Sequence, residues 1–516
     1  MILGARPVLG VATRRPLPSL TVLTKDVPTE IALDRPSTGA GRNQRWLAIV
    51  LVAAAGLFAR WWIGSSAQEF TRLSGDEGMS AVSAFDVLHG QPHLLIGASN
   101  YGGTLEALVL APLLKIFGAH VWLVRIVASA IFALAAVAAA KAAKVIFDRR
   151  ISWMVGGLLW LMSGAIVLLS MTMYLGYNSG LLFSVVSLGL MMRLAKEDRP
   201  IWTFFAAGVA AGLAVWGHPL FVVPLMPAML ALTVMRRSDI RRWLLALAGG
   251  SVLGLSPFLA WNAMNGWASI LHNPPPLVAT TYRERLETVF AQLFPRAFGL
   301  RGQQGDWLYP RKLGVAAFIV LLVLIHVGLI VLARRSRAGV VVAASGFLAI
   351  PLVAAFPALF WSNDARYAIV VLVPWLMGLC VWVDLLLRRR RSAALWAGAL
   401  VLIFGLLSTG KWMHRYARVR ADANGQSVAM VKALDARGVR GVIGAYWDVY
   451  RIGFFSNDRI VVHVPPEIAG PDRSTRSTDA VMALPKNRVA YVNYLPQGAV
   501  CLDRETVAGI EICFAT

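Results

Sequence analysis

Residues 46–63, WLAIVLVAAAGLFARWWI, form an apolar run that is broken by a single arginine and is long enough to cross a bilayer as a helix. Further apolar blocks recur along the chain as far as Gly410. Of the 516 residues, 57% are hydrophobic and only 15% are charged, against about 25% in an average soluble protein. The sequence therefore predicts a polytopic α-helical membrane protein and excludes a soluble enzyme or a disordered chain.

Eleven segments have the length and composition of membrane spans. They lie at residues 46–63, from 121 to 140, and at 151–170, 179–194, 201–216, 220–235, 243–261, 313–332, 339–360, 368–387 and 393–408. The apolar stretch Leu105–Phe117 is shorter and contains Pro112 and Lys115. We expect this stretch to form an interfacial or re-entrant helix rather than a span.

The basic residues orient these spans. The chain has 50 Lys and Arg against 27 Asp and Glu, which gives a formal charge of +23. With a cytoplasmic N-terminus, the six cytoplasmic pieces, including the run Arg388–Arg391, hold 25 of the 50 Lys and Arg residues. The charge therefore indicates orientation in the cytoplasmic membrane, with the C-terminus extracytoplasmic, and not a nucleic acid partner.

The composition divides the chain into three parts. Residues 1–45 are rich in Pro, Arg and Thr without an apolar core, and we expect a disordered cytoplasmic tail. Residues 46–410 hold the spans, with a first outer loop at 64–120. In residues 411–516 a helical pattern at 426–436 is followed by strand patterns at 441–445, 459–464 and 488–494, which predicts a small extracytoplasmic α/β domain.

Two of the three cysteines, Cys501 and Cys513, flank a predicted hairpin at the end of this domain. Three cysteines are too few for a disulfide framework. An oxidising exterior permits one disulfide between them, and two half-buried thiols are the alternative.

Candidate catalytic residues lie in the first outer loop. The segment LSGDEGMS, residues 73–80, places the carboxylates of Asp76 and Glu77 side by side. A loop acid is usually only solvated, but here an amphipathic helix is expected directly after the pair, at residues 79–88. The segment NYGGTLE, residues 100–106, then adds Tyr101 and Glu106. Together these residues can line a polar cavity above the membrane helices.

The order of these features resembles the GT-C glycosyltransferases, in particular the family 39-like protein O-mannosyltransferases and lipid A aminoarabinose transferases. The similar stretches are GDEGMSAVSAFDVLHGQPHLLIGASNYGGTLEALVLAPLLKIFGAHVWLVRIVAS, residues 75–129, and WSNDARYAIVVLVPW, residues 361–375. A weaker similarity, YWDVYRIGFFSNDRIVV at residues 446–462, is to the outer domain of some bacterial members.

This resemblance implies transfer of a sugar from a polyprenyl-phosphate donor to a lipid, cell-envelope glycan or protein acceptor at the outer membrane face. Asp76 would accept the proton of the attacking hydroxyl, with inversion if attack is direct, and Glu77 would assist. Arg366 would bind the donor phosphate, with snorkelling or a pair with Asp364 as the alternative. Tyr367 would contact the headgroup or belong to the interfacial aromatic belt.

The chain departs from the family pattern at two places. Many relatives have Lys-Pro-Pro or His-Pro-Pro where this chain has Tyr101-Gly102-Gly103, so a lysine contact to the donor cannot be carried over. Relatives often have an acid after the third span, where the nearest candidate here is Asn178, which can bind substrate but cannot act as a base. Glu106 is either the missing carboxylate or a cap of its own helix.

His218 and a metal ion are the remaining candidates. His218 precedes Pro219 on the outer side, where it is either a sugar or phosphate contact or a turn residue. Asp76 and Glu77 could hold a divalent cation such as Mg or Mn, but the chain has no Asp-X-Asp motif to support it. His89 and His93 have metal-like spacing, although Pro92 lies between them. Whether the protein binds a metal ion is therefore left open by the sequence.

Two other classes fit a polytopic chain, namely a transporter or lipid flippase and a non-catalytic scaffold. A transporter needs ionisable groups near the bilayer midplane, whereas most charged residues here lie at span ends or in loops. A pocket at the outer side that brings Asp76 to Arg366 favours the transferase.

Overall fold

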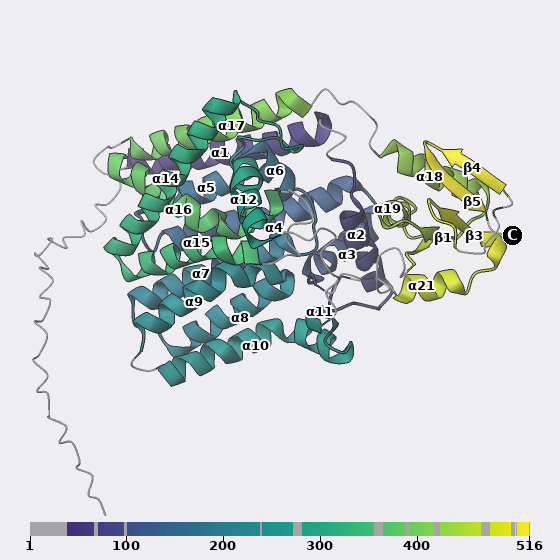
Figure 1. Cartoon of the computed structure of the whole chain (residues 1–516), viewed down its shortest axis with the longest axis horizontal. Helices are drawn as coiled ribbons and strands as arrows, with labels where there is room; N and C mark the ends of the chain where they lie inside the picture. The colour runs from purple at the N-terminus through teal and green to yellow at the C-terminus, as the bar shows by residue number, and fades with distance from the viewer. Residues whose placement is uncertain are drawn as a thin grey trace, which may run out of the picture.

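The computed structural model describes residues 39–66, 71–96, 101–237, 240–271, 281–355, 365–387, 392–416, 424–465, 475–496, 501 and 503–514. Residues 1–38 of the tail expected at 1–45, the basic run at 388–391 and Asp364 lie outside these ranges. Residues 39–45 are helical, as the start of α1 (Gly39–Ser66), which corrects the expected disorder there. Figure 1 shows a bundle of long helices at one end of the molecule and a small sheet domain at the other. Helices α2 (Gly75–Leu88) and α3 (Leu105–Phe117) lie between them.

Described helices lie at all eleven predicted span positions, but not all of them are long enough to cross a membrane. Eight are long and apolar enough to cross a membrane. These are α1 (Gly39–Ser66), α4 (Val121–Ala143), α7 (Tyr177–Lys196), α10 (Ile240–Met264), α14 (Arg311–Arg335), α15 (Arg337–Ala355), α16 (Ile369–Leu387) and α17 (Ala393–Tyr416). Two shorter apolar helices, α8 (Ile201–Gly217) and α9 (Val222–Met235), and one bent pair occupy the three remaining predicted positions.

The bent pair corrects the prediction of one straight span at 151–170. Helices α5 (Arg149–Trp160) and α6 (Gly164–Ser170) meet at 80°. Ser163 leaves the helical conformation, and its hydroxyl accepts the N–H of Ile166 at 3.3 Å. A serine that caps a new helix satisfies one otherwise unpaired donor, which offsets part of the cost of the turn.

Small residues bring some membrane helices into backbone contact. A Cβ atom at Gly208 of α8 would lie 2.1 Å from the Leu247 carbonyl oxygen of α10, and one at Gly254 would lie 2.2 Å from the Val209 carbonyl oxygen. Such close approach is typical of helix pairs in membranes, where packing replaces the hydrophobic effect as the driving force.

The helix expected at 79–88 begins earlier than predicted. Ser74 caps α2, because its hydroxyl accepts the Glu77 N–H at 3.2 Å and the Glu77 carboxylate accepts the Ser74 N–H at 3.0 Å. This capping box places Asp76 and Glu77 on the first turn of a helix and not in a loop. The helix expected at Leu105–Phe117 is confirmed with those bounds.

The C-terminal part forms the predicted α/β domain. Its helices are α18 (Gly425–Ala436), α19 (Tyr446–Phe455) and α21 (Thr475–Met482), and its strands are β1 (Gly441–Gly444), β2 (Val461–His463), β3 (Val489–Val492), β4 (Asp503–Val507) and β5 (Ile510–Phe514). The strand order is β2-β1-β3-β5-β4. The first three strands are parallel, and β5 runs antiparallel to β3 and β4.

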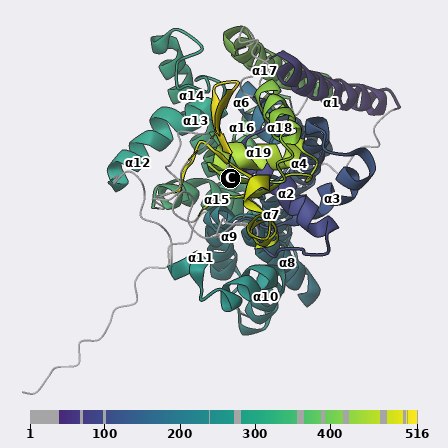
Figure 2. The same ribbon diagram turned by 90° about the vertical axis from the view of Figure 1, so that its right-hand side faces the viewer.

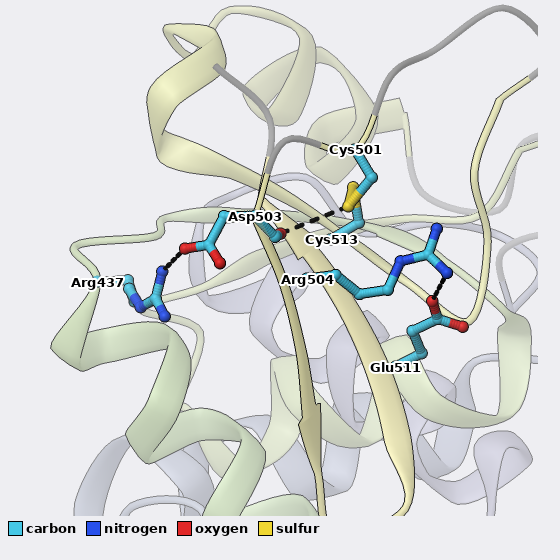
Figure 3. The surroundings of a disulfide bond; sticks show 6 residues. All are labelled: Arg437, Cys501, Asp503, Arg504, Glu511 and Cys513. Atoms are coloured by element: carbon cyan, nitrogen blue, oxygen red, sulfur yellow. Dashed lines mark hydrogen bonds and ion pairs between the residues drawn. A yellow bond between two sulfur atoms is a disulfide. The ribbon is translucent and has the colours of Figure 1, made fainter.

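The two flanking cysteines resolve the alternative left by the sequence. Cys501 and Cys513 form a disulfide that joins the start of the terminal hairpin to β5. Figure 3 shows this bond beside two ion pairs of the hairpin, Arg437 with Asp503 and Arg504 with Glu511. Cys380 is buried and free.

Candidate active site

Asp76 has a different partner on each carboxylate oxygen. Tyr446 donates its hydroxyl to Oδ1 at 2.7 Å, and Nη1 of Arg366 lies 3.4 Å from Oδ2. The residue is 8% exposed. The structure therefore brings together Asp76 and Arg366, which are 290 positions apart and were both predicted as site residues.

Arg366 lies among aromatic rings. It belongs to the short helix η4 (Ala365–Ala368), which leads directly into α16. Its guanidinium carbon lies 5.0 Å from the ring centre of Tyr174, 5.3 Å from that of Tyr367 and 6.0 Å from that of Tyr177. A guanidinium over ring faces gains cation–π attraction and is held in place without losing its charge. The arrangement presents a positioned cation beside Asp76.

Glu77 is engaged inside the protein. Its side chain is fully buried, and its Oε1 pairs with Nη1 of Arg125 at 2.8 Å. Burial raises the pKa of Glu77, and the Arg125 charge and the hydrogen bonds from Ser74 and Met173 oppose that rise. Both oxygens of Glu77 have partners. The hydrogen bonds from Ser74 and Met173 fix the first turn of α2 in place. A catalytic role for Glu77 stays a prediction.

His218 lies in the same aromatic group. Its Nδ1 accepts the Leu220 N–H at 3.2 Å, and its ring centre lies 4.0 Å from that of Tyr177 and 5.2 Å from that of Tyr101. Burial and then the positive charge of Arg366 lower the pKa of His218 to about 3, so the imidazole is neutral. Its Nε2 is buried and has no hydrogen-bond partner among the described residues. Such an atom can meet a polar ligand group.

Glu106 of α3 forms hydrogen bonds to the start of a neighbouring helix. Its Oε1 accepts the N–H of Ser179 at 3.0 Å and the Ser179 hydroxyl at 3.1 Å, at the start of α7. Glu106 also lies in the first turn of α3, as the dipole alternative expected, and its side chain adds these contacts to α7. Burial raises the pKa of Glu106 to about 7, against the effect of these hydrogen bonds.

Asn178 lies beside Ser179 in the same turn. Its amide Nδ2 donates to the Thr172 carbonyl oxygen at 3.3 Å. Its Oδ1, like Oε2 of Glu106, is buried without a hydrogen-bond partner among the described residues. These two oxygens and Nε2 of His218 are buried polar atoms with capacity to bind a ligand or water.

The structure gives a reason why this chain has Tyr101-Gly102-Gly103 where many members of the family it resembles have Lys-Pro-Pro or His-Pro-Pro. The Gly103 N–H donates to the Gly217 carbonyl oxygen at 3.0 Å, and a Cβ atom at Gly103 would lie 2.9 Å from the Trp216 carbonyl oxygen. A proline at Gly103 would lack this donor, and any side chain would clash. The glycine thus brings the segment with Tyr101 against the turn that carries His218.

The donor set does not suit a divalent cation. Among the residues that the structure describes, no three His, Cys, Asp or Glu side chains come together as a metal site would require. Glu77 pairs with Arg125, while Arg366 and Tyr446 occupy Asp76. The two histidines with metal-like spacing pair with carboxylates instead, His89 with Asp458 and His93 with Asp86. We therefore derive no step through a metal.

Tyr446 and Tyr174 are site residues that the sequence interpretation missed. Tyr446 opens the stretch with a weak similarity to outer domains, but it is 370 positions from Asp76. The signals in the sequence were this weak similarity and the aromatic cluster YWDVY.

No protein-family model matches the chain, and no curated protein does. Two solved structures of ArnT from Cupriavidus metallidurans are similar to it. The structure bound to undecaprenyl phosphate has a TM-score of 0.59 at 16% identity, and the apo structure 0.57 at 15%; each match covers 90% of this chain and 97% of ArnT. The archaeal oligosaccharyltransferase AglB from Archaeoglobus fulgidus, in complex with an inhibitory peptide and a dolichol-phosphate, has a TM-score of 0.52 at 13% identity. That match covers 88% of this chain and 70% of AglB.

These matches establish the fold class. The chain has the polytopic GT-C fold of membrane glycosyltransferases, as its resemblance implied. Because the sequence identities are only 16% and 13%, the likeness to ArnT and AglB is one of fold alone.

Proposed function

We propose that the chain is a membrane glycosyltransferase that moves a sugar from a polyprenyl-phosphate donor to a lipid, glycan or protein acceptor at the outer face of the cytoplasmic membrane. The observation that carries the proposal is the approach of Arg366 to Asp76, with 3.4 Å between Nη1 and Oδ2. A base beside a positioned cation is what this transfer requires.

The chemistry assigns one role to each of the two groups. Asp76 accepts the proton of the acceptor hydroxyl as its oxygen attacks the anomeric carbon. The bond from that carbon to the phosphate oxygen breaks, and its electron pair stays on the phosphate. Arg366 stabilises that charge. Its distance of 3.4 Å from Asp76 is longer than the about 2.7–2.9 Å of a tight charge-assisted hydrogen bond.

The fold matches support this donor class. ArnT was solved with undecaprenyl phosphate and AglB with dolichol-phosphate, and both ligands are polyprenyl phosphates. We assign Tyr367 and Tyr101 to the aromatic walls of the donor site. We assign Nε2 of His218, Oδ1 of Asn178 and Oε2 of Glu106 to polar contacts with the sugar or phosphate, since these buried atoms have binding capacity to spare.

A transporter or flippase is a weaker candidate. Alternating access requires a site that can open to both sides of the membrane. The polar group around Asp76 lies at one end of the bundle, where α2 separates the membrane helices from the sheet domain (Figures 1 and 2). That position favours chemistry at one face.

The test uses the donor that accumulates when the protein is missing. Lipid-linked sugars extracted from cells without the gene are mixed with purified protein in lipid nanodiscs and a cell-envelope acceptor fraction. We expect free polyprenyl phosphate to be released only when protein and acceptor are both present. The Asp76→Asn variant should release none, whereas Asp479→Asn, at an exposed position on α21, should match the wild type. Movement of intact donor across vesicles without cleavage would instead identify a flippase.

A further inference from the structure

The sheet domain contacts the proposed base directly. Tyr446 is the first residue of α19, and its hydroxyl donates to Oδ1 of Asp76 at 2.7 Å. Tyr446 is 9% exposed and Asp76 8% exposed, so water competes little for this hydrogen bond. Figure 1 shows α19 next to α2 on the side that faces away from the bundle.

The sequence Gly-Asp-Glu-Gly makes this contact possible. A Cβ atom at Gly78 would lie 2.9 Å from the Tyr450 carbonyl oxygen, and one at Gly75 would lie 2.9 Å from the Tyr446 ring. Glycine on either side of the acidic pair therefore lets α19 pack against the first turn of α2. Met79 and Val82 of α2 continue the contact by joining the hydrophobic core of the sheet domain.

A second contact holds the other end of α2. Arg476 of α21 pairs with the buried Asp86, and its Nη2 lies 3.0 Å from Asp458. Burial alone would raise the pKa of Asp86, but hydrogen bonds from His93 and Arg476 outweigh burial and lower it. The domain is thus attached at both ends of the helix that carries Asp76, which fixes Tyr446 relative to it.

We propose that Tyr446 is a positioning residue for Asp76, and that the sheet domain thereby completes the reaction site; this inference rests on the proposed function. The hydroxyl holds Oδ1 while Arg366 lies near Oδ2. Without the hydroxyl, the carboxylate can turn and form a two-pronged pair with the guanidinium. In that pair Asp76 could no longer accept the proton of the acceptor hydroxyl, and Arg366 could no longer stabilise the phosphate.

The test is Tyr446→Phe, which removes one oxygen and keeps the ring packing. We expect kcat to fall roughly 10- to 100-fold, the range for loss of a hydrogen bond to a charged group. The KM values for donor extract and acceptor fraction should not change, because a positioning residue acts on Asp76 and not on either substrate. Tyr491→Phe, on β3 of the same domain, should keep the wild-type kcat.

A second variant tests the packing that places the hydroxyl. Gly78→Ala adds a methyl group against the Tyr450 backbone and should also lower kcat. Gly249→Ala, in α10 where a Cβ meets no atom within 4 Å, is the matched control. Thermal unfolding of each variant shows whether the fold is kept.

The outcomes separate this inference from the proposed function. A normal kcat in Tyr446→Phe, together with an inactive Asp76→Asn, overturns the positioning role and leaves the transferase standing. A raised KM with normal kcat makes Tyr446 a substrate contact and also overturns it. An active Asp76→Asn removes the proposed mechanism itself.

Discussion

At the residue scale, two adjacent carboxylates have different environments because a helix turns about 100° per residue. Glu77 faces Arg125 inside the protein, while Asp76 faces Tyr446 and Arg366. The capping box decides which acid faces inward. Glu77 is at the third helical position, where its side chain reaches back to the backbone N–H of the cap residue Ser74. This difference is why we propose Asp76, and not Glu77, as the base.

Asp76→Asn should lower transfer by roughly 100-fold or more, the usual contribution of a general base, while the protein keeps its thermal midpoint. Glu77→Gln should show the opposite balance, with a lower midpoint and a smaller loss of rate, because it weakens the pair with Arg125. Turnover assays and unfolding curves on both variants measure this contrast. Near-normal turnover in Asp76→Asn would remove the residue from the mechanism.

Arg366→Ala should weaken donor binding more than acceptor binding, because the phosphate loses its cation. Arg366→Lys should restore only part of the affinity, since a lysine cannot make a forked contact and stacks less well on Tyr174 and Tyr367. Binding of the donor extract to protein in nanodiscs measures both. Equal donor affinity in all three proteins would mean that Arg366 serves only the structure.

At the element scale, the start of α7 depends on a side chain of α3. The carboxylate of Glu106 receives two hydrogen bonds from Ser179, although burial disfavours its charge. A buried acid at a helix N-terminus balances desolvation against the helix dipole. Here desolvation wins, and the pKa rises to about 7.

Glu106 should make the folded state less stable as the pH rises. Its folded pKa of about 7 lies above the ordinary glutamate pKa of 4.5, so the folded state binds the proton more tightly. The contribution is complete below about pH 4.5 and is lost as the pH passes 7. Glu106→Gln mimics the neutral acid and should raise the thermal midpoint at pH 8 relative to the wild type, with little difference at pH 5. Equal shifts at both pH values would contradict the raised pKa.

At the scale of the whole molecule, one helix couples the membrane bundle to the sheet domain. Helix α2 contacts Arg125 of α4 and Arg366 of η4 on one side, and Tyr446 and Arg476 on the other. Figure 2, turned to face the sheet domain, shows this domain over the middle of the bundle end. The proposed reaction site therefore lies where the two parts meet.

Orientation is tested with single cysteines. Lys432→Cys, exposed on α18, should react with an impermeant thiol reagent in intact spheroplasts, whereas Asp198→Cys, between α7 and α8, should react only after lysis. Background should be low, because Cys380 is buried and the other two native cysteines form a disulfide. The reverse pattern would place Asp76 in the cytoplasm and contradict the proposed lipid-linked donor.

Local patterns in the sequence were sufficient for much of this protein. Hydropathy and length predicted the membrane helices, the separate helix Leu105–Phe117 and the terminal α/β domain, because each depends on residues close together in the chain. The acidic pair and Arg366 could also be singled out, because the first outer loop and the later Arg-Tyr pair resemble the GT-C glycosyltransferases in order and position.

Tertiary structure alone decided how these parts act together. The turn at Ser163, the use of Glu106 by α7 and the approach of Tyr446 to Asp76 depend on which surfaces pack. Residues 290 and 370 positions apart meet at Asp76, and no local periodicity encodes such a pairing. The sequence determined which groups are present, whereas packing determined that one carboxylate pairs with an internal arginine and its neighbour meets a tyrosine from the far end of the chain.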